Sequence, residues 1–160
     1  MKQNISIFID HLSEPKDVTD IQEIFEFIVD DELKAETNKM RLLLNEGKKD
    51  EFNSLKKKLP AVTFSGRFAQ TRRVEHLVEY SQLLCLDFDK IPRDNLKKVK
   101  EIIIQLPTTK LLFTSPSGSG FKVVVEVNSS EKEHKNVYNQ VAKYYENATG
   151  LISDHTSDIS

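Results

Sequence analysis

Hydrophobic and polar positions follow their clearest pattern between residues 83 and 149. Residues 83–89 begin with a strongly apolar run, and residues 109–115 and 121–127 are rich in Leu, Phe and Val, which predicts three buried strands. Residues 93–106 and 131–149 instead repeat apolar side chains at helical spacing. The apolar positions of the two predicted helices are Leu96, Val99, Ile103 and Leu106 in the first, and Val137, Val141 and Tyr144 in the second. The predicted order is therefore strand, helix, strand, strand, helix.

The first 80 residues predict a mixture of helices and short strands. Alternation of apolar with polar or small residues indicates a strand, an Asp-rich start indicates a helix, and Pro60 ends the helical region. The predicted elements are a strand at 5–9, a helix from 17 to 29, helical segments at 33–44 and 51–55, a strand at 61–68, and one or two helical turns at 74–78.

Together these elements predict an α+β fold in one compact domain, residues 1–160. The order in the second half is the beginning of an RRM-like β-α-β-β-α-β unit, whose last strand would come next. We expect an N-terminal αβ module at 1–80 and the RRM-like module at 81–160. After residue 150 the chain offers only Leu151 and Ile152 before a polar, acid-bearing end. We therefore expect the final strand to be missing.

Composition narrows the classes of protein. With 160 residues, 38% hydrophobic and 30% charged, the chain is globular rather than disordered. A net charge of −2 provides no general attraction for nucleic acid, so any such contact must come from a local patch. The single cysteine, Cys85, excludes an internal disulfide and fits a reducing cytoplasm, and no signal peptide or membrane-length apolar run is present. We expect a cytoplasmic protein.

The acids Asp87 and Asp89 are the most informative chemical signal. Residues two apart on a strand project from the same face, so these carboxylates should point together, with Phe88 turned into the core. Adjacent carboxylates repel each other and lose hydration, and a cation such as Mg²⁺ or Mn²⁺ between them relieves both effects. The alternative is a strand that has simply reached solvent and ends in polar residues.

A second signal is the Ser- and Gly-rich connection between the predicted strands 109–115 and 121–127. Two strands joined in this way predict a hairpin with a wide loop. Glycines allow backbone N–H groups to face a ligand and serines add hydroxyl donors, which suits phosphate oxygens, and Lys122 could add positive charge. The alternative is a plain flexible turn. The candidate phosphate-binding residues are Ser115, Ser117, Gly118, Ser119, Gly120 and Lys122.

Several segments, in order, resemble the VirE N-terminal domain family, which is found mainly in Bacteroidetes and their mobile elements and is related to archaeo-eukaryotic-type primase-polymerases. The resemblance covers nearly the whole chain. It rests on the segments at 59–68 (LPAVTFSGRF), 75–89 (EHLVEYSQLLCLDFD), 115–122 (SPSGSGFK) and 150–160, from GL to DIS.

The resemblance implies a role for each candidate residue. Asp87 and Asp89 match the metal-binding motif of the primase superfamily, and Asp154, with Asp158 as its rival, matches a late acid that completes the metal site. Lys122 stands where the superfamily has a phosphate-contacting His.

The resemblance also implies an activity. Two Mg²⁺ or Mn²⁺ ions would support template-directed nucleotidyl transfer from nucleoside triphosphates on single-stranded DNA, with a helicase domain further along the full-length protein. Arg67, Arg72 and Arg73 are candidates for contacting the template backbone, the alternative for them being a solvated loop. Because of the missing strand, we expect this piece to show little or no primer synthesis.

Two other functions remain open at the level of the sequence. One is a non-catalytic nucleic-acid-binding module, in which the acids bind no metal. The other is a haloacid-dehalogenase-like phosphatase, in which the first Asp is a nucleophile and a later Ser binds phosphate. The position of Asp87 far from the chain start, and the immediate return of the chain as a strand after Gly120, disfavour the phosphatase.

Overall fold

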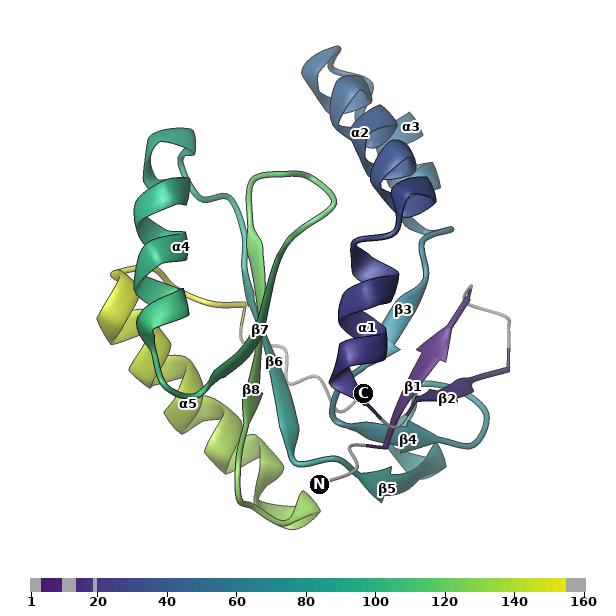
Figure 1. The fold of residues 1–160 in the computed structure, drawn as a ribbon, viewed down its shortest axis with the longest axis vertical. Helices are drawn as coiled ribbons and strands as arrows, with labels where there is room; N and C mark the ends of the chain where they lie inside the picture. The colour runs from purple at the N-terminus through teal and green to yellow at the C-terminus, as the bar shows by residue number, and fades with distance from the viewer. Residues whose placement is uncertain (1–3, 10–13, 19, 155–160) are drawn as a thin grey trace.

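The structure is a computed structural model that describes residues 4–9, 14–18 and 20–154. The chain forms two halves that lie side by side, one made of residues up to about 80 and the other of the residues that follow (Figure 1). The described residues combine helices with small antiparallel sheets, so the fold class is α+β, as predicted.

The second half contains a three-stranded antiparallel sheet in the order β6-β8-β7, with α4 and α5 on one of its faces (Figure 1). The predicted order of strands and helices is confirmed. The elements are β6 (Leu83–Phe88), the 3₁₀ turn η2 (Arg93–Asn95), α4 (Leu96–Gln105), β7 (Thr109–Thr114), β8 (Phe121–Glu126), the 3₁₀ turn η3 (Glu131–Glu133) and α5 (His134–Thr149).

Strand alternation gives this sheet two buried faces. Leu84, Leu86 and Phe88 of β6 pack with α4 and α5 in the larger core cluster. Leu83 of β6 and Val124 of β8 instead join a second cluster with residues of the first half. Asp87 continues this second face towards the end of β6, opposite Lys122 of β8 in the strand register.

The first half contains two smaller antiparallel sheets, β2-β1-β3 and β4-β5, and three helices. Asp20 caps the first helix by accepting a hydrogen bond from Gln22 N at 2.9 Å. The elements are β1 (Ile5–Phe8), β2 (Lys16–Val18), α1 (Ile21–Ile28), α2 (Asp31–Asn45), α3 (Lys49–Lys56), β3 (Ala61–Thr63), β4 (Gly66–Phe68), the 3₁₀ turn η1 (Val74–His76) and β5 (Leu77–Tyr80).

Three details of the prediction for the first half are wrong. Residues 16–18 form a strand rather than the start of the helix, which begins at residue 21. The single strand predicted at 61–68 is interrupted by a turn at residues 64–65. The helical turns predicted at 74–78 are limited to the 3₁₀ turn η1 at residues 74–76, and strand β5 begins at residue 77. Each strand involved has three or four residues, too few to show a period, so pairing with a neighbouring strand decides its conformation.

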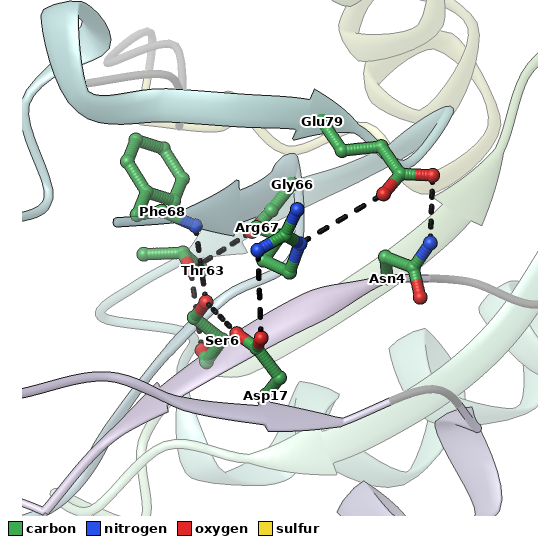
Figure 2. A network of polar contacts seen from close by, with 8 residues as sticks. All are labelled: Asn4, Ser6, Asp17, Thr63, Gly66, Arg67, Phe68 and Glu79. Carbon is green, nitrogen blue, oxygen red and sulfur yellow. Dashed lines mark hydrogen bonds and ion pairs between the residues drawn. The ribbon is translucent and has the colours of Figure 1, made fainter. Parts of the chain in front are cut away.

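A network of polar contacts joins the five strands β1 to β5 of the described part of the first half (Figure 2). The Arg67 guanidinium lies 3.5 Å from Asp17 Oδ2 and 3.8 Å from Glu79 Oε2, and Asn4 Nδ2 donates to Glu79 Oε1 at 2.6 Å. Ser6 Oγ donates to Asp17 Oδ1 and accepts from Phe68 N. Thr63 Oγ1 of β3 donates to Ser6 O and to Gly66 O, so the network links β1, β2, β3, β4 and β5.

After α5 the chain turns back to the sheet. Gly150 ends the helix in the left-handed conformation, with φ of 73°, and the buried Ser153 is held by Glu146 Oε1. Asp154 N then donates to Asp87 O at 2.8 Å, so the chain reaches the side of β6 that β8 does not occupy. Within the described ranges, no helix is long and apolar enough to cross a membrane.

Candidate functional site

The two oxygens of the Asp87 carboxylate have different surroundings. Oδ2 forms an ion pair with Lys122 Nζ across the β6–β8 pair, and the two side chains are 27% and 33% exposed. Oδ1 is buried and has no hydrogen-bond partner among the described residues. A buried carboxylate oxygen without a partner costs free energy, so a cation or a donor group in this position would stabilise the site.

Lys122 stays charged in this setting. Burial alone would lower its pKa, but the hydrogen bond to Asp87 and the electrostatic interactions with Cys85, Asp87 and Asp89 outweigh burial, and the pKa of Lys122 is raised above its ordinary value. The contribution of Asp89 shows that both acids act electrostatically on the same lysine. A positive charge at this end of the sheet is therefore present at neutral pH.

Asp89 follows β6 and is exposed, beside the start of β8. A Cβ atom on Gly120 would lie 2.5 Å from Phe88 O, 2.7 Å from Asp89 Oδ1 and 3.1 Å from Ser115 Oγ. Only glycine allows this approach of the loop to the acid. The Ser- and Gly-rich loop of the predicted hairpin therefore packs closely against Asp89.

The loop at residues 115–120 presents a row of hydroxyl groups. Ser115 Oγ lies 2.9 Å from Ser117 Oγ, which lies 3.1 Å from Ser119 Oγ. Backbone hydrogen bonds close the loop, from Ser115 N to Gly120 O and from Gly118 N to Ser115 O. A wide hairpin loop was predicted here, and β7 and β8 form it.

The late acid predicted at Asp154 is brought to Asp87 through its backbone. Besides the bond from Asp154 N to Asp87 O, the carbonyl of Asp154 accepts from Tyr138 Oη at 2.9 Å. The Asp154 side chain is exposed. Asp158, its rival, lies outside the described residues.

The described acids do not form a ready-made metal cluster. Within residues 4–9, 14–18 and 20–154, no group of three or more His, Cys, Asp or Glu side chains is placed to hold a metal ion. The residues nevertheless suit a hard cation in part, because Asp87 and Asp89 supply carboxylate oxygens and Asp87 Oδ1 is buried without a partner in that part of the chain.

The three arginines predicted to contact a template have other partners in the first half. Arg67 is held by Asp17 and Glu79 in the network of Figure 2. Arg72 lies over the Phe8 ring, 5.9 Å from its centroid, and Arg73 pairs with Glu75 at 3.7 Å. Arg67 therefore has a structural role, which the sequence interpretation did not include.

Sequence reasoning missed Arg41, which contacts the loop from α2. Its Nε donates to Pro116 O and its Nη2 to Ser115 O, both at 3.3 Å. Gly118 adopts φ of 78°, and a Cβ atom on it would lie 3.1 Å from Arg41 Nε. No pattern in the sequence signals a contact between residues 74 apart.

Comparison with known families assigns the chain to a family. The structure defines the class of protein: an α+β domain with a charged site at one end of an antiparallel sheet. Residues 54–159 match the family model described as BT4734-like, N-terminal domain, and the chain belongs to this family, which is of a Bacteroidetes type. No curated protein matches the chain, and no solved structure does.

Proposed function

We propose that this domain is a primase-polymerase-type nucleotidyltransferase, as its resemblance to the VirE N-terminal domain family implies. One observation carries the proposal. Asp87, the Ser- and Gly-rich loop, Lys122 and the backbone of Asp154 come from separate parts of the sequence and meet at one end of the β6–β8 sheet. Nucleotidyl transfer needs acids and phosphate-binding groups in this combination.

In this proposal each group acts on a different part of the substrate. The hydroxyl groups and backbone N–H groups of residues 117–120, with the Lys122 ammonium, bind and orient the triphosphate. Asp87 and Asp89 supply the negative ligands of the site, with Asp154 as a third. When bound there, Mg²⁺ or Mn²⁺ neutralises phosphate charge and lowers the pKa of the attacking hydroxyl. The partners would be nucleoside triphosphates, a single-stranded DNA template and a helicase domain of the full-length protein.

A second candidate is a non-catalytic nucleic-acid-binding module. It is favoured by the ion pair between Lys122 and Asp87, which already neutralises the first acid, and by the incomplete metal cluster of the described residues. A haloacid-dehalogenase-like phosphatase has no such support, because β7 continues into an antiparallel hairpin with β8 rather than into a helix.

The test of the activity is primer formation on single-stranded DNA with Mn²⁺ and nucleoside triphosphates by the full-length protein, because this piece alone is expected to show little or no synthesis. Asp87→Asn and Asp89→Asn should each lower synthesis by about 10²-fold or more, because each removes a carboxylate ligand of the metal ions that would neutralise the phosphate charge. Asp50→Asn, an exposed acid of α3, is the matched control and should leave synthesis unchanged. Synthesis that survives both site substitutions would refute the proposal. Absence of synthesis together with Mn²⁺-independent DNA binding would favour the binding module.

Lys122→Ala addresses the role of the lysine. Because the ammonium group is proposed to contact phosphates, which all nucleotides share, the substitution should weaken binding of all four nucleoside triphosphates by a similar factor, about tenfold. Isothermal titration with each nucleotide measures this. Loss of affinity for one base alone would place Lys122 at a base pocket instead.

A further inference from the structure

A pocket of about 350 Å³ lies beside the loop, separate from the Asp87–Lys122 pair. Three parts of the chain line it: α2, the loop between β7 and β8, and the turn that precedes α4. Its polar lining consists mainly of Arg41, Asn45, Arg93, Ser117 and Ser119, while neither Asp87 nor Lys122 lines it. The volume is in the range of small-molecule sites.

The charge of this pocket is positive. Arg41 and Arg93 both line it, and no carboxylate of the described residues does. Among the ion pairs formed within the described ranges, none involves either arginine. A positively charged pocket with hydroxyl and amide groups is suited to an oxyanion, and arginine matches phosphate oxygens through paired N–H donors.

Arg41 is oriented before any ligand arrives. Its Nε and Nη2 donate to backbone carbonyls of the loop, and its Nη1 lies 3.5 Å from Asn38 Oδ1. A guanidinium carries five N–H donors, so these contacts leave others for a ligand. The loop hydroxyls of Ser117 and Ser119 lie in the same lining and can rotate to donate to an oxyanion.

We propose that this pocket binds the phosphate groups of a nucleoside triphosphate, with Arg41 and Arg93 as its ligands from two different elements. The charge and the donor groups of the pocket suit a phosphate oxyanion. The further assignment of this phosphate to a nucleoside triphosphate rests on the proposed function. Arg41 lies before residues 54–159, the part that matches the family model, so α2 adds a phosphate ligand from outside the matched region.

The experiment measures binding of inorganic tripolyphosphate to the whole chain by titration calorimetry, in EDTA so that metal binding at Asp87 does not contribute. Arg93→Gln removes an exposed charge, and Arg41→Lys keeps the charge but removes the paired donors. Each should weaken tripolyphosphate binding about tenfold.

Lys39→Gln on α2 and Lys97→Gln on α4 are the controls. Both lysines are exposed and lie outside the pocket, so these substitutions should change binding less than twofold. Melting curves of all variants report whether they fold.

Three results would overturn the inference: no binding of tripolyphosphate by the parent chain, equal weakening in the controls, or binding unaffected by either arginine substitution. A second arm uses a single-stranded oligonucleotide without terminal phosphate. If the arginine substitutions weaken oligonucleotide binding and leave tripolyphosphate binding intact, the ligand is a phosphodiester backbone and the triphosphate assignment is wrong. If tripolyphosphate binding depends on the arginines but primer synthesis does not depend on Asp87 and Asp89, the pocket stands and the proposed function falls.

Discussion

At the scale of single residues, the surroundings of the Asp87 carboxylate bear on the proposed metal site. Its Oδ2 is paired with Lys122, and its buried Oδ1 has no partner within the described part of the chain. A divalent cation would gain Oδ1 and Asp89 as ligands, while it would be repelled by the Lys122 ammonium. The affinity of the site therefore depends on the balance between these two effects.

The first prediction is that Mn²⁺ stabilises the fold through Asp87 and Asp89. A ligand that binds only the folded state at about 100 times its Kd adds about 2.7 kcal/mol to the free energy of unfolding. For a chain of this length that corresponds to a rise in Tm of about 5–10 °C. The double substitution Asp87→Asn with Asp89→Asn should abolish the rise, and Asp50→Asn should keep it. A melting curve of the parent chain that does not move with Mn²⁺ would count against the site.

The second prediction concerns Lys122→Met and alkaline pH. Because the pKa of Lys122 is raised in the folded state above its ordinary 10.5, its stabilising contribution is fully present below that value and is lost as pH rises through the raised pKa. Below the ordinary value, Lys122→Met should lower the free energy of unfolding by about 1–3 kcal/mol, since it leaves Asp87 without its partner.

The measurement is urea unfolding of both proteins at several pH values from about 8 to about 12. The difference between the parent and Lys122→Met should shrink above pH 10.5, whereas the exposed Lys97→Met should show a small difference at every pH. A difference that stays constant to the highest pH would mean that the ion pair does not stabilise the fold.

At the scale of elements, α4 shows how an amphipathic helix holds the site-bearing sheet. Ile103 is fully buried in the larger core cluster, and its neighbour Ile104 is 57% exposed. Three consecutive isoleucines of the helix therefore lie in three environments: Ile102 is partly buried, Ile103 is buried and Ile104 is exposed. The stability of the β6-β8-β7 sheet depends on the buried face.

The third prediction follows from this pair of neighbours. Ile103→Ala removes buried methyl and methylene groups and leaves a cavity, so it should lower the free energy of unfolding by about 2–5 kcal/mol. Ile104→Ala, the same substitution one residue later, should change it by no more than about 0.5 kcal/mol. Urea unfolding of the two variants measures both values, and equal effects would show that the two faces of α4 are assigned wrongly.

At the scale of the whole molecule, one core cluster connects the two halves. Ile5 and Ile24 of the first half share this cluster with Leu83 and Val124 of the β6–β8 sheet. Contacts of this kind couple the stability of the two halves, because loosening one exposes apolar surface of the other. Arg41 adds a polar contact between α2 and the loop that carries the site.

The fourth prediction is that the halves unfold together. Ile24→Ala, at a fully buried position of α1, should lower the free energy of unfolding by about 2–5 kcal/mol. Hydrogen exchange of backbone amides should become faster both in β1 and in β8, although the substituted residue belongs to the first half. The exposed Phe25→Ala, one residue later, is the control. Faster exchange confined to the first half would indicate two independent domains rather than the single domain expected from the sequence.

The candidate site was only partly accessible from the sequence. Strand alternation predicted that Asp87 and Asp89 lie near each other and that the loop at 115–120 is a hairpin, and both acids do act on Lys122. The ion pair between Lys122 and Asp87 was not predicted. It depends on the register of β6 against β8, which is set when the buried faces of the two strands pack in the assembled core.

The sequence by itself determined the order of elements from β6 to α5 and the buried face of α4, because these segments are long enough for a hydrophobic period to identify them. The face predicted for α5 is wrong in part: its buried residues are His134, Tyr138, Ala142 and Tyr145, and Tyr144 is 47% exposed. Only the tertiary structure decided β2, β4 and β5, whose three or four residues acquire strand conformation by pairing with partners. It also decided the position of Arg41 on the loop and the return of Asp154 to Asp87. These contacts join residues more than 60 positions apart, and no local pattern encodes them, because they arise when separate elements pack on a common core.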